Sequence, residues 1–154
     1  MIFRDFRIHL MLLAVCLFLI IVPAINKTPS QEVADQAMAA ANQFLLLVDT
    51  EEYVRSWEVS SSALKNILSR AAWKDQIAEL LAFLGPILDR EARDISYTRH
   101  ARDIPAGEYV VLTFLSRFGN RPVATETVTL KLGADAAWRV AGYFIRYGDP
   151  PARA

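Results

Sequence analysis

Glu126, Arg146 and Ser116 are the polar residues whose positions most suggest a site. All three lie in segments where apolar and polar residues alternate, the pattern of a half-buried β-strand. On one face of neighbouring strands, Glu126 and Arg146 would form a partly buried ion pair, with Ser116 as a third polar group. Such a trio could anchor a ligand in a pocket. The alternative is a structural salt bridge at the end of the sheet, beyond the helices that cover it. This structural interpretation is favoured because ion pairs often serve structure alone.

Four aromatic residues, Tyr53, Trp57, Trp73 and Trp138, could also line a pocket, and Trp57 and Trp138 are the ligand-binding candidates among them. Aromatic residues at helical spacing more often fill a core.

A further charged series alternates in sign and is typical of a solvated face. It comprises Asp89, Arg90, Glu91, Arg93, Asp94, Arg99, Arg102 and Asp103.

Several kinds of chemistry lack the residues they need. His100 is the one histidine after the N-terminal apolar run, and the single cysteine, Cys16, lies inside that run. A zinc site needs three or four such ligands, so no metal and no cofactor are predicted. No partners for a histidine-based triad stand at a recognisable spacing, and no glycine-rich phosphate loop is present. We therefore predict no catalytic residue and no enzymatic activity.

The N-terminus has the pattern of an export signal. Arg4 and Arg7 precede an unbroken apolar run over residues 10–22. The segment is either a signal peptide cleaved after Ala24 or an uncleaved anchor formed by residues 8–25, and its length leaves both open. In either case the basic residues stay inside and the rest of the chain is exported. The predicted location is the periplasm, free or anchored to the inner membrane.

Composition limits the partners. The chain of 154 residues carries 17 basic and 17 acidic side chains, so it lacks the positive field that nucleic-acid binding requires.

The predicted organisation is a leader over 1–24, a linker and helix start over 25–34, one domain over 35–147 and a disordered tail over 148–154.

The hydrophobic period changes once along the domain. Up to about residue 90 apolar residues recur every three or four positions and predict helices, with Ser30 as the first N-cap and with Gly85 and Pro86 closing the helix that contains Leu84. Afterwards the period is two and predicts strands over 95–99, 109–118, 123–132 and 138–147. The expected fold class is α+β, with N-terminal helices packed on a four-stranded antiparallel meander sheet. This layout is similar to the cone-shaped cystatin-like and nuclear-transport-factor-2-like folds.

Two assumed hairpin registers, Phe118 with Ala124 and Leu132 with Trp138, assign the faces of the sheet, and a slip of one residue would invert them. The predicted core face carries Val110, Leu112, Phe114, Phe118, Val128, Leu130, Trp138, Val140 and Phe144, with Ser116, Glu126 and Arg146 at one end. The opposite face carries Tyr109, Val111, Thr113, Leu115, Thr125, Thr127, Thr129, Tyr143, Ile145 and Tyr147. This threonine and tyrosine face is a possible homodimer interface.

Several short strings resemble the bacterial family called domain of unknown function 4019. They are Tyr53, Ser56-Trp57, Trp73, Leu84-Gly85, Arg90, the run 107–111, Phe118, the run 126–129 and the run 138–146, the last being the most specific. The resemblance covers residues 35–147 and implies a small exported protein with an N-terminal leader and no assigned activity. The family pattern has an arginine and a proline shortly before Leu84-Gly85, where this chain has Leu81 and Phe83.

These observations predict an envelope protein that binds a protein partner or a small apolar ligand without catalysis. One alternative is a membrane-anchored periplasmic scaffold, similar to the bridge components of type IV secretion systems. Another is a small hydrolase or isomerase that uses Glu126 inside the cone.

Overall fold

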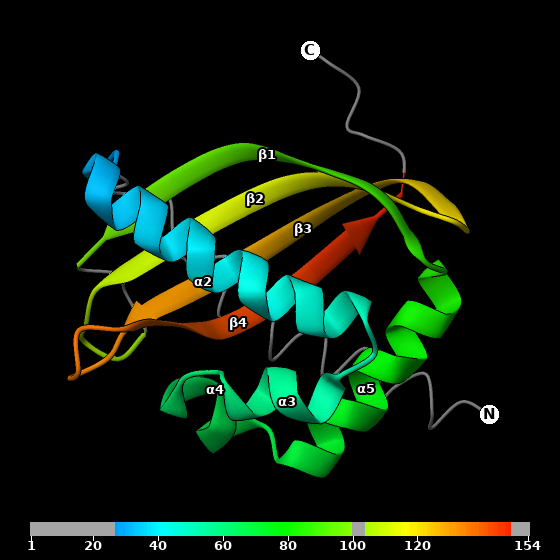
Figure 1. Cartoon of the computed structure of the whole chain (residues 1–154), viewed down its shortest axis with the longest axis horizontal. Helices are drawn as coiled ribbons and strands as arrows, with labels where there is room; N and C mark the ends of the chain where they lie inside the picture. The colour runs from blue at the N-terminus through cyan, green and yellow to red at the C-terminus, as the bar shows by residue number, and fades with distance from the viewer. Residues whose placement is uncertain (1–26, 100–103, 149–154) are drawn as a thin grey trace.

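The computed structural model describes residues 27–99 and 104–148. Four helices come first, α2 (Gln31–Asp49), α3 (Tyr53–Glu58), α4 (Ser62–Ile67) and α5 (Arg70–Leu84). Four strands follow, β1 (Ile87–Thr98), β2 (Tyr109–Phe118), β3 (Arg121–Leu132) and β4 (Trp138–Tyr147), and they form one sheet in that order. Helices followed by an antiparallel meander confirm the predicted α+β class (Figure 1).

Some predicted features lie outside the described residues. These are the leader over 1–24, the histidine at position 100, Arg102 and Asp103, and the tail beyond Gly148. Within the described residues no helix is long and apolar enough to cross a membrane.

Serine side chains begin three of the helices. Ser30, Ser61 and Ser69 accept hydrogen bonds from the backbone N–H groups of Val33, Leu64 and Ala72, respectively. Each satisfies a donor that has no partner inside the helix, which is the usual role of an N-cap serine. The predicted cap at Ser30 is therefore confirmed.

The boundary between helix and strand comes earlier than predicted. Helix α5 ends at Gly85, whose φ of +81° suits glycine, and a Cβ there would lie 3.1 Å from the backbone nitrogen of Asn120. Strand β1 then begins at Ile87, so the helical prediction to about residue 90 was wrong. Gly85 and Pro86 end the helix, as their residue types predict, and the error lies in expecting helical structure for a few residues beyond them.

The β2–β3 hairpin is tighter than predicted. Ser116 pairs with Ala124 and Phe118 pairs with Arg121, where the assumed register paired Phe118 with Ala124. The difference is two residues at Ser116, and a shift of two keeps every side chain on its predicted face. Glu126 consequently lies opposite Phe114 on the core face.

A β-bulge in β4 reverses part of the predicted assignment. Leu130 pairs with Val140 as predicted, but the next pair is Thr129 with Gly142, which leaves Ala141 as an extra residue. Beyond a bulge the alternation of faces is inverted. The core face therefore receives Tyr143, Ile145 and Tyr147, and their predicted place on the opposite face was wrong.

Phe144 and Arg146 occupy the outer face instead. Both had been assigned to the core face with Glu126, and that part of the prediction was wrong. The correction removes Arg146 from the interior, where it had been paired with Glu126.

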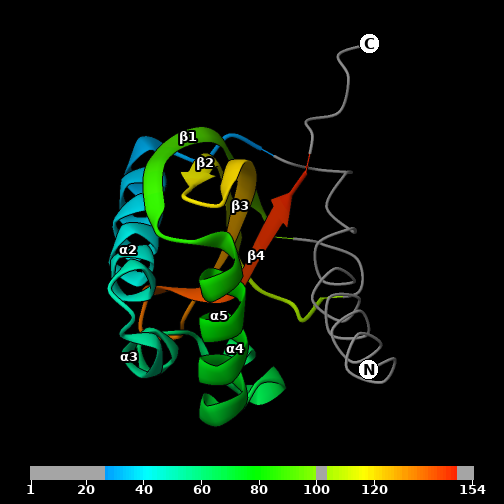
Figure 2. The ribbon, with the colours of Figure 1, turned by 90° about the vertical axis from the view of Figure 1, so that its right-hand side faces the viewer.

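The core lies between the sheet and the helices. Helix α2 runs diagonally over one face of the sheet, and in the edge-on view it lies on one side of it (Figures 1 and 2). Phe44 of α2 is almost fully buried and meets the rings of Trp73 and Tyr143 at centroid distances of 5.9 and 5.5 Å. These three rings fill the space between the sheet and the helices.

The outer face, defined by the strand residues that point away from α2, is only partly open. Tyr109, Thr129, Ser96 and Thr98 are buried on it, and the hydroxyl of Tyr109 donates a hydrogen bond to the carbonyl oxygen of Pro105. At its other end, where β2 turns into β3, Leu115 is exposed.

Candidate functional site

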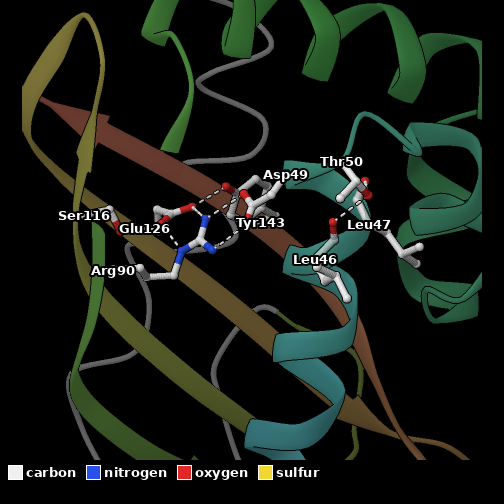
Figure 3. Close-up of polar contacts among 8 residues, drawn as sticks. All are labelled: Leu46, Leu47, Asp49, Thr50, Arg90, Ser116, Glu126 and Tyr143. Carbon is white, nitrogen blue, oxygen red and sulfur yellow. Dashed lines mark hydrogen bonds and ion pairs between the residues drawn. The ribbon is translucent and has the colours of Figure 1, made fainter. Parts of the chain in front are cut away.

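A buried charge cluster centred on Glu126 is the candidate site. Glu126 has no exposed surface, and each of its two carboxylate oxygens accepts two hydrogen bonds (Figure 3). Arg90 Nε and Ser116 Oγ donate to Oε2, the first over 2.5 Å. Arg90 Nη2 and the hydroxyl of Tyr143 donate to Oε1 over 3.0 and 2.5 Å. An ionised carboxylate offers about four acceptor positions, so Glu126 is saturated.

Arg90 joins this carboxylate to a second one. Its guanidinium also donates from Nη1 to Asp49 Oδ2 over 2.7 Å and from Nη2 to Asp49 Oδ1 over 3.0 Å. Its side chain is only 16% exposed, and it lies between the two acids in Figure 3. The planar fork of arginine binds carboxylates with two bonds each, which a lysine could not reproduce.

Asp49 ends helix α2, where the partial negative charge of the helix disfavours a carboxylate. Helix α2 has no basic residue in its last turn, so Arg90 of β1 provides the cation that this end lacks. The carbonyl oxygens of Leu46 and Leu47 accept from the backbone N–H groups of Thr50 and Glu52, and the hydroxyl of Thr50 lies 2.8 and 3.4 Å from the same two oxygens (Figure 3). Backbone and side-chain donors thus satisfy the end of the helix, and the ion pair of Asp49 with Arg90 fixes it to the sheet.

The protonation states of the cluster follow from its surroundings. Burial alone would lower the pKa of Arg90, but hydrogen bonds and charges from Asp49 and Glu126 raise it well above its usual range. Burial, and then the charge of Glu126, raise the pKa of Tyr143 well above its ordinary value. Arg90 therefore stays charged, and Tyr143 stays a neutral donor to Glu126.

This geometry suits a structural clamp better than acid–base catalysis. A general base needs a free lone pair within reach of a substrate proton. The lone pairs of Glu126 are taken by four donors from Arg90 of β1, Ser116 of β2 and Tyr143 of β4. Asp49 adds helix α2, so one cluster connects all four strands with the helix that covers them.

The structure separates the residues that the sequence suggested for the site. Ser116 contacts Glu126 as predicted. Arg146 does not, because the bulge in β4 places it exposed on the outer face, so the predicted pair of Glu126 with Arg146 was wrong. Trp57 belongs to the helical layer, where its Nε1 donates to the carbonyl oxygen of Leu68 over 2.8 Å. Trp138 is buried at the start of β4, opposite Leu132 at the far end of β3 from Glu126.

Sequence reasoning missed Arg90, Asp49 and Tyr143. Arg90 was placed on a solvated face because its neighbours alternate in charge, yet β1 turns its side chain toward the core. A signal existed, since Arg90 is one of the residues that carry the family resemblance. Asp49 was interpreted only as the end of a helix. No group of three or more His, Cys, Asp or Glu side chains is placed to hold a metal ion in the part of the chain that the structure describes.

The fold and cluster define a small α+β domain in which helices cover one face of a four-stranded meander. Residues 40–143 match the family model described as "Protein of unknown function (DUF4019)". The chain belongs to this family, and the resemblance inferred from its sequence is confirmed. No curated protein and no solved structure matches the chain.

Tyr143→Phe tests the protonation state of the cluster. Well below pH 10 the tyrosine is protonated in both the folded and the unfolded chain, so its hydrogen bond contributes fully to the free energy of unfolding and does not depend on pH. Above that pH the unfolded chain loses the proton while the folded chain keeps it, so stability falls by about 1.4 kcal/mol per pH unit from this group.

We expect Tyr143→Phe to reduce the fall between pH 10 and 11 by about 1 kcal/mol, measured by urea unfolding, because the unfolded tyrosine is only half ionised at pH 10. Tyr147→Phe removes an exposed hydroxyl and is the matched control. A slope identical in the Tyr143→Phe variant and the wild type would contradict the role of Tyr143.

Proposed function

We propose that this protein is a non-enzymatic module of the cell envelope that binds a protein partner. One observation carries the proposal, an exposed cluster of Phe83, Arg121 and Tyr147. The guanidinium of Arg121 lies 4.6 Å from the ring centre of Phe83 and 5.8 Å from that of Tyr147. The two rings are 5.4 Å apart, and Phe83 and Tyr147 are 48% and 41% exposed.

Three distant segments build this aromatic–arginine cluster. Phe83 lies in the last turn of α5, Arg121 begins β3 and Tyr147 ends β4. The side-chain amide of Asn120 donates to the carbonyl oxygen of Phe83 over 3.2 Å, which fixes the hairpin against the helix. A surface of aromatic and arginine side chains has the composition of an interface hot spot, and contacts that hold these side chains in place before binding lower the entropic cost of binding.

A protein partner fits better than a small apolar ligand. The interior that would hold such a ligand is occupied by the rings of Phe44, Trp73 and Tyr143. The alternative of a hydrolase or isomerase relies on Glu126, whose lone pairs are already engaged. The exposed aromatic–arginine cluster needs neither an internal cavity nor a free carboxylate.

Site-specific photocrosslinking tests the proposal. A photoreactive phenylalanine at position 83 of the full chain, in its native cell envelope, should give one discrete adduct of higher mass. Arg121→Glu should reduce the yield of this adduct by at least about fivefold, since hot-spot residues contribute more than about 1 kcal/mol. The same label at Leu46, exposed on α2, is the control. Equal adducts at both positions, or none at position 83, would contradict the proposal.

The envelope location is tested separately. The basic start and the apolar run of the leader support export, either as a cleaved signal or as an anchor. The intact mass of the chain expressed in a Gram-negative host distinguishes the two. A mass that starts at Ile25 indicates a free periplasmic domain, and a full-length mass in the membrane fraction indicates an anchored module, as the scaffold alternative requires. A full-length soluble cytoplasmic product would contradict export.

A further inference from the structure

The outer face of the sheet carries charges of opposite sign on its two edge strands. On β1 the exposed residues Asp89 and Asp94 flank Glu91, whose side chain is 61% exposed. On β4 the exposed residue that lies on this face is Arg146. No hydrogen bond or ion pair engages Arg146 within residues 27–99 and 104–148, whereas Glu91 contacts Arg93, whose side chain is 52% exposed, over 3.0 Å.

Glu91 and Arg146 stand on the same row of the sheet. Glu91 pairs with Leu115 of β2, Leu115 pairs with Thr125 of β3, and Thr125 pairs with Arg146 of β4. The row therefore reads acid, apolar, neutral polar and base from edge to edge, with Leu115 37% exposed. It lies at the open end of the outer face, away from the buried residues Ser96 and Thr129.

This arrangement complements itself under a two-fold rotation. When two such faces stack with the rotation axis parallel to the strands and midway between β2 and β3, β1 of one copy lies over β4 of the other, and each row meets itself. Glu91 then faces Arg146 of the second copy, and the reverse pair forms at the other edge. Stacked sheets lie about 10 Å apart, a distance that glutamate and arginine side chains together can bridge.

We propose that this face is a homodimer interface, in which two symmetry-related pairs of Glu91 with Arg146 flank a centre formed by Leu115 and Thr125 of both copies. The interface is isologous, so each contact between two residues forms twice, once from each copy. It uses the face opposite to α2 and leaves the aromatic–arginine cluster free, because Tyr147 lies on the core side beside Phe83. The dimer would present two copies of that cluster to a partner.

A charge exchange on the full chain tests the dimer. We expect light scattering coupled to size-exclusion chromatography to give a dimer mass at about 0.1 mM, well above a micromolar Kd. Glu91→Arg and Arg146→Glu should each weaken the dimer by at least about tenfold, because each places two like charges together. The double variant Glu91→Arg with Arg146→Glu restores both pairs with reversed sign and should restore the dimer.

Glu79→Arg, an exposed charge reversal on α5, is the matched control and should leave the dimer unchanged. Because the N-terminal segment is the same in every variant, any association through it does not respond to these substitutions. A monomer in the wild type would overturn the proposal, as would a dimer that both single variants leave intact. A double variant that stays as weak as the single variants would overturn the predicted pairing and with it the geometry.

Discussion

Glu126→Ala is expected to lower the free energy of unfolding by about 3–5 kcal/mol, the range for breaking a buried ion pair. The substitution leaves Arg90 with one of its two carboxylates and removes the acceptor of the Ser116 and Tyr143 hydroxyls. Buried donors without a partner lose their solvation and gain nothing in return. Urea unfolding followed by tryptophan fluorescence measures the change.

Arg146→Ala is the control, because it removes the arginine that the sequence had suggested as the partner of Glu126. Arg146 is exposed, so its loss should change the free energy of unfolding of the monomer by no more than about 0.5 kcal/mol. Equal losses in the Glu126→Ala and Arg146→Ala variants would contradict the described cluster.

Phe44→Ala is expected to cost a similar amount, about 3–5 kcal/mol, for a different reason. Phe44 is the apolar centre of the contact between α2 and the sheet and packs against Trp73 and Tyr143. Its removal opens a cavity between α2, the Trp73 ring of α5 and the Tyr143 ring of β4. The loss is measured by the same unfolding experiment.

Phe83→Ala is the control for Phe44→Ala, because it removes the same side chain at a position where the ring is about half exposed. Its expected cost is below about 1 kcal/mol, because only part of the ring area is buried. A well-folded Phe44→Ala variant with wild-type stability would show that α2 does not cover the core face as described.

Regular alternation is the reason why much of the sheet could be predicted. Leu112, Phe114 and Ser116 alternate without interruption, so their common face followed from the period of two, even though the assumed hairpin register was wrong by two residues. The helical layer was predictable from apolar residues that recur every three or four positions, and Ser30 marked its start.

The bulge in β4 was not predictable from alternation. Ala141 and Gly142 are small and fit either face, so alternation does not mark an extra residue, although a glycine inside a strand is a known signal of a bulge. Its consequence is large, because every residue after it changes face, which brings Tyr143 to Glu126 and takes Arg146 away.

Arg90 shows a second limit of local patterns. Its neighbours Asp89 and Glu91 suggest a solvated surface, and only the pairing of β1 with β2 brings Arg90 beside Ser116 on the core face. Its partners lie 36 and 41 positions away along the chain, Glu126 after it and Asp49 before it. Long-range charge pairs of this kind depend on topology, which local periodicity does not report.

A double-mutant cycle between Glu126 and Arg90 tests most directly whether the buried carboxylate is a structural clamp. The unfolding free energies of Glu126→Gln, Arg90→Met and the double variant give the coupling between the two residues. We predict a coupling of about 2–3 kcal/mol for this pair and none within error for the same cycle with Arg146→Met. A negligible coupling to Arg90, or a substantial one to Arg146, would contradict the account.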